Sequence, residues 1–431
     1  MMSQKEIVNY TLEALNRAGA QKFQVNLTFT EKHEVNLEAN EFTMVRTTFD
    51  TDIVLTAIKD KKKGTISINK SDIQSIDSAA QDVILVAEAS PEDEANDIAE
   101  YQPPKVFSSG DRTPDLEMMY HRMNELVKQI KEKYPKIILI QAFLYHEYKE
   151  SYFANSNGVD YVSNQGVYNF FAMFSSKDQD KTSSFNYTSF SLKNLDKELL
   201  NCGTLDILLK QLEEQTNTRP VEGKFVGDVI ISPDAVNDIL DFLTRSLSDN
   251  SIISGTSIYK DKLEKQIASP LLTVHSCPVS EEICSGYFVT KDGYEARNIT
   301  IIDKGVLKNF LLSLYGSKKT GLKYAYNDGG AFVIEPGETA LDDMIRSVKK
   351  GILLMRFSGG YPSDSGDFSG VAKNSYLIED GKIKYPISET MISGNIAEML
   401  KNITAISKEQ VNFGWQVLPW ISVKGVTISG K

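Results

Sequence analysis

The chain has 431 residues, which is enough for two or three domains with a sizeable core. Hydrophobic residues make up 41% and charged residues 24%, as in ordinary globular proteins. Acidic residues outnumber basic ones by 58 to 47, and the net charge of −11 argues against nucleic acid as the main ligand, because DNA binding draws mainly on Lys and Arg.

Cysteine and histidine are scarce, with 3 Cys and 4 His. Few side chains are therefore available for a metal site. Three cysteines cannot all pair in disulfides, which favours a reducing, cytoplasmic setting. The first twenty residues lack the cationic start and apolar core of a signal peptide, and no apolar run approaches 18 residues, so we expect no membrane association.

The first hundred residues predict a sheet flanked by two helices. Ser3 and Glu6 form an S-x-x-E capping box at the start of the first helix. Residues 24–69 alternate or carry β-branched side chains and are predicted to form five short strands, and a second helix follows at 71–89. We interpret residues 1–100 as an N-terminal α+β domain.

Residues 90–110 differ in composition because they are acidic and contain three prolines, so we predict a linker there. A helix follows at about 113–135, and the residues from 137 to 192 have the pattern of strands, with Asn157-Gly158 as a turn. We interpret residues 101–218 as a middle α+β domain.

The remaining residues, 219–431, predict a β-rich C-terminal domain. It starts with a strand at 227–231 and a helix opened by Ser232 and Pro233. Helices and strands are segregated along the chain rather than alternating. We therefore predict an α+β fold, in which an N-terminal mixed region with antiparallel sheets precedes a largely antiparallel β domain.

One local group of residues offers soft metal ligands, namely His275, Cys277 and Cys284. Three protein ligands and a water are enough for a catalytic zinc. The spacing matches no recognised metal motif, however, and small buried cysteines are common in protein cores. Both interpretations stay open.

A glycine-rich segment contains Gly366, Asp367, Phe368 and Ser369. Glycine allows a ligand to approach the backbone closely, so this segment is our candidate for a loop that faces a substrate cavity. A tight turn between two strands explains the same residues equally well.

Several stretches together resemble one known family. The most specific are the G-D-F-S at Gly366–Ser369 and a Pro336-Gly337 pair followed by a helix that ends in Lys349-Lys350-Gly351. Longer similar stretches cover 292–321, 336–360 and 365–406. On these residues the chain resembles the TldD/PmbA family, also called modulator of DNA gyrase proteins, most clearly after about residue 220.

The resemblance has a consequence for metal binding. The TldD branch of the family carries H-E-x-x-x-H on the helix that opens the C-terminal domain, and a late cysteine completes its zinc site. In this chain the corresponding residues, 231–237, contain neither His nor Glu, and no Cys follows Cys284. The resemblance therefore implies the TldE/PmbA-like branch, with no zinc, no other cofactor and no catalytic residue in this chain.

What the resemblance implies about function is a peptidase subunit. We expect a cytoplasmic metalloprotease complex for peptides or unfolded proteins, in which a TldD-like partner supplies the zinc; a homodimer is the other assembly considered. Direct contacts with nucleic acid or membrane are not expected. Two alternatives stay open: an autonomous metallopeptidase with an atypical site at His275, Cys277 and Cys284, and a non-proteolytic peptide-binding or modulator protein.

Overall fold

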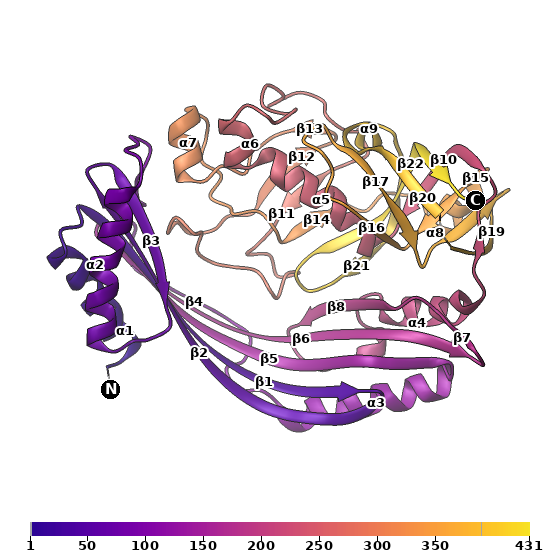
Figure 1. Cartoon of the computed structure of the whole chain (residues 1–431), viewed down its shortest axis with the longest axis horizontal. Coiled ribbons are helices and arrows are strands. Elements are labelled where there is room, and N and C mark those ends of the chain that lie inside the picture. The colour runs from indigo at the N-terminus through magenta and orange to yellow at the C-terminus, as the bar shows by residue number, and fades with distance from the viewer. Residues whose placement is uncertain (1, 389) are drawn as a thin grey trace.

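A computed structural model describes residues 2–388 and 390–431 of the chain. Figure 1 shows a long curved sheet from the first half of the chain running beneath a β-rich region from the second half. The fold combines helices with mostly antiparallel sheets, which confirms the predicted α+β class. In the described part of the chain, no helix is long and apolar enough to cross a membrane.

The first sheet contains eight strands among the described residues, in the order β3-β2-β1-β5-β6-β4, with β7 and β8 also paired to β6. All of its pairs are antiparallel except β4 with β6. The strands are β1 (Lys22–Glu38), β2 (Glu41–Lys59), β3 (Lys62–Ile68), β4 (Lys105–Ser109), β5 (Ile137–Asn155), β6 (Asp160–Asp178), β7 (Lys181–Thr182) and β8 (Asn186–Leu192).

The strands of this sheet are longer than the sequence pattern predicts. Residues 24–69 form three strands rather than five, because β1 and β2 continue through segments whose hydrophobic alternation lapses. The middle of β1 is only partly buried, yet its backbone pairs with both β2 and β5 throughout. Backbone pairing on both sides thus maintains the strand where side-chain burial does not.

Four helices accompany this sheet within the described residues, and their positions follow from where the sheet is apolar. At one end, α1 and α2 pack Leu15, Ile76 and Val83 onto β1 and β2, and at the other end α3 buries Met119 and Met123 against β5. The capping box predicted at Ser3 and Glu6 is present. The helices are α1 (Gln4–Arg17), α2 (Ile73–Ala89), α3 (Leu116–Lys133) and α4 (Leu205–Glu214).

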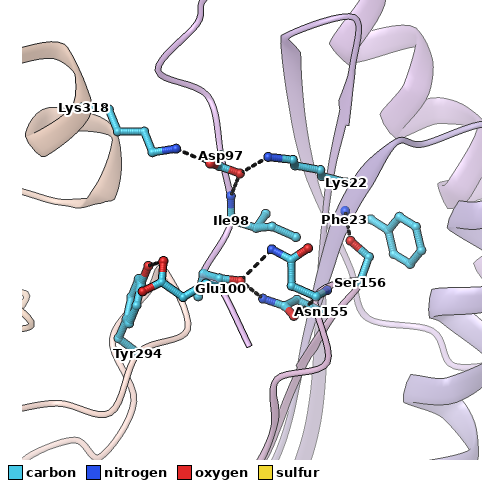
Figure 2. Close-up of polar contacts among 11 residues, drawn as sticks. Lys22, Phe23, Asp97, Ile98, Glu100, Asn155, Ser156, Tyr294 and Lys318 are labelled. Carbon is cyan, nitrogen blue, oxygen red and sulfur yellow. Dashed lines mark hydrogen bonds and ion pairs between the residues drawn. The ribbon is translucent and has the colours of Figure 1, made fainter. Parts of the chain in front are cut away.

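Residues 90–100, which we call the acidic strap, are held in place rather than free. Figure 2 shows Asp97 between Lys22 of β1 and Lys318 of the C-terminal region. The Lys22 Nζ lies 2.5 Å from Asp97 Oδ1, and the same oxygen accepts a hydrogen bond from the Ile98 backbone. Burial alone would raise the pKa of Asp97, but the hydrogen bonds from Lys22 and Lys318 outweigh it, so the pKa is lowered.

Other residues of the acidic strap make similar contacts with the C-terminal region. The Lys319 Nζ lies 2.9 Å from Asp93 Oδ2, the Tyr315 hydroxyl donates to the same oxygen, and the pKa of Asp93 is lowered to about 2 by backbone and side-chain hydrogen bonds. The Tyr294 hydroxyl donates to Glu100, as Figure 2 shows. This connecting segment is therefore not freely solvated, because its acidic side chains bind basic and hydroxyl groups across two regions, and its role as a linker between domains stays a prediction.

The second sheet contains fourteen strands among the described residues. Its strands are β9 (Arg219–Pro220), β10 (Lys224–Ile231), β11 (Val274–Ser276), β12 (Ile299–Asp303), β13 (Val306–Leu307), β14 (Phe332–Ile334), β15 (Lys350–Leu354), β16 (Arg356–Gly359), β17 (Asp367–Lys373), β18 (Tyr376–Glu379), β19 (Lys382–Ser388), β20 (Thr390–Asn395), β21 (Ile403–Asn412) and β22 (Val417–Ser429). The helices of this region are α5 (Pro233–Leu247), α6 (Asp249–Ile253), α7 (Leu314–Thr320), α8 (Leu341–Ser347) and α9 (Ile396–Lys401).

Strand β22 organises this region because it pairs with β10, β14, β20 and β21. One buried cluster continues from α3 and the end of the first sheet into α5 and β22. Strands on both sides of residue 100 also share the first sheet. The division into domains at 1–100, 101–218 and 219–431 stays a prediction, although pairing and core packing both cross its boundaries.

Candidate functional site

Two of the three residues of the alternative metal site, His275 and Cys284, make other side-chain contacts. His275 lies on β11, where its Nδ1 is 3.0 Å from Thr300 Oγ1 and its Nε2 is 3.1 Å from Glu335 Oε1. Burial raises the pKa of Cys277, and it raises the pKa of Cys284 to about 11. Both thiols are therefore protonated at neutral pH in this fold, whereas metals bind the thiolate form. Over residues 2–388 and 390–431, no group of three or more His, Cys, Asp or Glu side chains could hold a metal ion.

Less of the glycine-rich segment forms a loop than the sequence indicates. Gly366, with φ of +95°, forms the turn, whereas Asp367, Phe368 and Ser369 already belong to strand β17. Asp367 is exposed and accepts hydrogen bonds from Asn395 and from Ser365. The structure thus uses Asp367, Phe368 and Ser369 for pairing with β20, and a role in facing substrate stays a prediction.

Phe368 is the residue of that segment that contributes to a hollow. Its ring meets the Phe357 ring edge-on, with the centroids 5.6 Å apart, and both rings line a small apolar cavity beside α5. Phe357 also lines a larger cavity next to it. That larger cavity, of about 310 Å³, is the candidate site described below, and we call it the α5 cavity.

The α5 cavity lies where the two regions of the molecule meet. Strand β8 of the first sheet supplies one wall, and the start of α5, strand β16 and the segment before β22 supply the others. In Figure 1, α5 and β16 lie in the upper region and β8 lies beneath them. The residues that matter for its chemistry are Tyr187, Asp234, Asp238, Arg356, Phe357 and Trp415.

Local sequence explains how α5 presents its carboxylates. Ser232 is the N-cap and Pro233 occupies the first turn, an ordinary place for proline. The Ser232 hydroxyl does not cap the helix but donates to the Met355 carbonyl, which ties α5 to the end of β15. The apolar residues of α5 then face the core, and Asp234 and Asp238, one turn apart, both line the cavity.

Both carboxylates have raised pKa values. Burial raises the pKa of Asp234 to about 7, although the Thr204 hydroxyl donates to its Oδ1. The other oxygen, Oδ2, is buried and has no hydrogen-bond partner among the described residues. The pKa of Asp238 is raised to about 6, first by desolvation within the cavity walls and then by the negative charge of Asp241. At pH 7 about half of Asp234 and about a tenth of Asp238 are therefore protonated, more than for an ordinary aspartate.

Arg356 presents a different kind of group on the opposite wall. Its guanidinium lies 4.8 Å from the ring centroid of Phe185 and 5.4 Å from that of Tyr187. Its Nε is buried without an acceptor, and no described carboxylate forms an ion pair with this side chain. Desolvation lowers the pKa of Arg356, which nevertheless stays charged because free guanidinium titrates far above neutral pH.

Sequence reasoning missed Asp234, Asp238 and Arg356. A signal was present for the arginine, which directly follows the apolar run from Ile352 to Met355 and so had to lie beside a buried strand. No signal linked it to Phe185 and Tyr187, which are about 170 residues away and meet it only through the fold.

Two family models match the chain. The PmbA/TldA metallopeptidase C-terminal domain matches residues 223–430, and the PmbA/TldA metallopeptidase domain 1 matches residues 25–87. Together these ranges cover more than half of the chain. They include the α5 cavity's carboxylates and Arg356 as well as strands β2 and β3 and most of β1 in the first sheet.

Individual relatives agree with these matches. The Metalloprotease PmbA homolog of Haemophilus influenzae is 24% identical over 94% of this chain and 91% of its own length. The Zinc metalloprotease TldD homolog of Saccharolobus solfataricus is 28% identical, over 51% of this chain and 49% of its own. The crystal structure of TldE from Thermococcus kodakarensis superposes with a TM-score of 0.86 at 19% identity, covering 98% of this chain and all of that one, which shows a shared fold. The chain belongs to the TldD/PmbA family.

Proposed function

We propose that this chain is the TldE/PmbA-like subunit of a metalloprotease complex for peptides or unfolded proteins, in which a TldD-type partner carries the zinc. The observation that carries the proposal is the set of donor groups at the start of α5. This is the helix on which, by the resemblance, a TldD-type chain holds its metal. Here the cavity-facing residues of α5 include Asp234, Asn237 and Asp238, and none of them is His.

These donors do not fit zinc. Protein zinc sites are built mainly from His and Cys, with carboxylates in a minor share. Asp234 and Asp238 have raised pKa values, one oxygen of Asp234 already accepts from Thr204, and the Asn237 Oδ1 accepts from Gln416 at 2.8 Å. We therefore assign no step of peptide hydrolysis to a metal on this chain.

An open sheet edge supports the role of a subunit. Within the part of the chain that the structure describes, residues 41–52 of β2 pair only with β1, because β3 pairs with β2 from Ile53 onward. Along that edge Val45 is 67% exposed and Phe49 is 62% exposed. An unpaired strand with large exposed apolar side chains is typical of a surface that another chain covers. In the proposed complex the TldD-type partner occupies this edge.

The remaining parts of the proposal follow from composition. A net charge of −11 fits a cytoplasmic complex that acts on peptides without contacting nucleic acid. The α5 cavity, with aromatic walls and both acidic and basic groups, gives the chain a means of contacting peptide substrates.

The test is reconstitution with a TldD-type protein from the same organism. We expect the purified chain to contain no stoichiometric zinc by elemental analysis and to cleave no peptide. The two proteins mixed should form a complex by size-exclusion chromatography and cleave a fluorogenic peptide. As a matched control, the partner with its H-E-x-x-x-H glutamate replaced should form the same complex without cleavage.

Two results would count against the proposal. Stoichiometric zinc with peptidase activity in the isolated chain would make it an autonomous enzyme. Complex formation without peptidase activity would favour a modulator without a proteolytic role. A variant with Val45→Lys and Phe49→Lys should weaken complex formation, whereas Leu85→Lys on the exposed face of α2 should not.

A further inference from the structure

Arg356 is partly buried and forms no ion pair with a described residue, whereas the other arginines without such a pair, Arg112, Arg219, Arg245 and Arg297, are exposed. Arg17, Arg46, Arg122 and Arg346 each form an ion pair with an Asp or Glu of this chain. Arg356 forms none with a described residue, although it is more buried than Arg17, Arg46 or Arg346. Removing a charge from water without pairing it is costly, so an unpaired, partly buried guanidinium indicates a missing anion.

The aromatic rings around Arg356 leave its donors available. Phe185 and Tyr187 lie within cation–π distance of the guanidinium and stabilise its charge without using any of its N–H groups. A planar guanidinium whose faces are stacked can still form paired hydrogen bonds in its plane. The exposure of Phe185 and Tyr187, 47% and 46%, shows that this stack borders open space.

The acids of the α5 cavity do not neutralise this charge. Neither Asp234 nor Asp238 forms an ion pair with Arg356, and their pKa values are raised rather than lowered. A nearby guanidinium in direct contact would lower them. The cavity thus holds an unpaired cation, two acids with raised pKa values that form no ion pair with it, and the rings of Phe357 and Trp415.

We propose that Arg356 binds a carboxylate of a peptide in the α5 cavity. A carboxylate matches the planar donor edge of a guanidinium in shape and charge. A volume of about 310 Å³ lies at the lower end of small-ligand cavities, which suits the end of a peptide better than its middle. The α-carboxylate at the C-terminus is therefore the expected group, with an acidic side chain as the other source. This inference rests on the proposed function, because it assumes that the chain contacts peptides.

The experiment measures equilibrium binding to the full chain without a partner. Three probes are compared by isothermal titration calorimetry: acetyl-tetra-alanine with a free carboxylate, the same peptide as its C-terminal amide, and an amidated peptide with one internal glutamate. Trp415 lines the cavity, so its fluorescence gives a second readout. We expect the free acid to bind at least about 10-fold more tightly than the amide, as for a hydrogen-bonded charge pair.

Substitutions test whether the preference for the free acid comes from Arg356. In Arg356→Gln the preference for the acid should fall below about 2-fold, because the charged donor pair is gone. Arg346→Gln removes one positive charge from an exposed helix of the same region and should keep the full preference. If circular dichroism shows that Arg356→Gln does not fold, Arg356→Lys takes its place. Lysine retains the positive charge but not the two parallel N–H donors of the guanidinium, so the preference for the acid should be intermediate.

Each result of these titrations either supports or overturns the proposed carboxylate site at Arg356. Equal binding of the glutamate peptide and the free acid, both lost in Arg356→Gln, would support the subsite and identify a side-chain carboxylate as a ligand. No discrimination between acid and amide, no binding of any probe, or an unchanged preference in both Arg356 variants would overturn it. Because these titrations use the isolated chain, they are separate from reconstituted peptidase activity, on which the proposed function depends.

Discussion

The first sheet meets the C-terminal region in two places, and charged groups are paired in one of them and unpaired in the other. At the acidic strap, Asp93 and Asp97 are paired with lysines and their pKa values are lowered. At the α5 cavity, Asp234 and Asp238 have raised pKa values and Arg356 has no anionic partner among the described residues. The charged groups of the strap are thus paired with one another and serve the structure. The charged groups of the cavity lack partners within the described chain, and a ligand could supply them.

The largest expected effect on the free energy of unfolding is at the strap, where Gly293 packs against the first sheet. Gly293 has φ of +88°, and a Cβ there would overlap the ring of Phe153 on β5. Gly293→Ala should lower the free energy of unfolding by about 3 kcal/mol, from overpacking and backbone strain together. Gly321→Ala is the control, because its φ is +71° but nothing lies near its Cβ; its cost should be about 1 kcal/mol. Urea denaturation measures both, and equal losses would mean that Gly293 is not tightly packed.

A smaller effect of opposite sign is expected in the α5 cavity. The folded-state pKa of Asp234, about 7, lies above its unfolded value, so ionisation destabilises the fold increasingly as pH rises from about 4 to 7. Asp234→Asn keeps an acceptor for Thr204 and removes this penalty. It should stabilise the protein by about 2 kcal/mol at pH 8 and by almost nothing at pH 4. Denaturation curves at the two pH values test this; Asp364→Asn, on an exposed loop, should change stability at neither.

The smallest effect is expected for a single paired carboxylate of the strap. The pKa of Asp97 is lowered in the fold, so its contribution is present at pH 7 and is lost as pH falls through the folded pKa. Asp97→Asn should lower the free energy of unfolding by about 1 kcal/mol at pH 7, since its lysine partners are partly exposed. The double variant with Lys22→Met should cost less than the sum of the two single variants. Additive costs would show that the pair is not coupled.

The fold class and the local features, such as helix caps and turns, could be predicted from the sequence, but contacts between distant segments could not. The capping box at Ser3 and Glu6 and the turn at Asn157-Gly158 depend on neighbouring residues and are present. The ion pairs of the acidic strap were not predicted, because lysine partners such as Lys318 lie about 220 residues away. Composition alone could not distinguish a solvated acidic segment from a paired one.

The candidate site was predictable only in part. The missing histidines on the helix after Ser232 are visible in the sequence, and they led to the expectation of a chain without zinc. Arg356 was not singled out, because its significance lies in what does not pair with it. The absence of a partner is a property of the folded arrangement around a residue, which no spacing pattern encodes.

The position of β10 also has a consequence for how the protein is made. This apolar strand, Lys224–Ile231, pairs with β15 and β22, which begin more than 100 and more than 190 residues further along the chain. During synthesis both edges of β10 therefore stay open until those distant strands emerge from the ribosome. Pairings of such long range form slowly, and an open apolar strand is prone to associate with other chains. Production of this protein should accordingly depend on chaperones that cover β10 in the meantime.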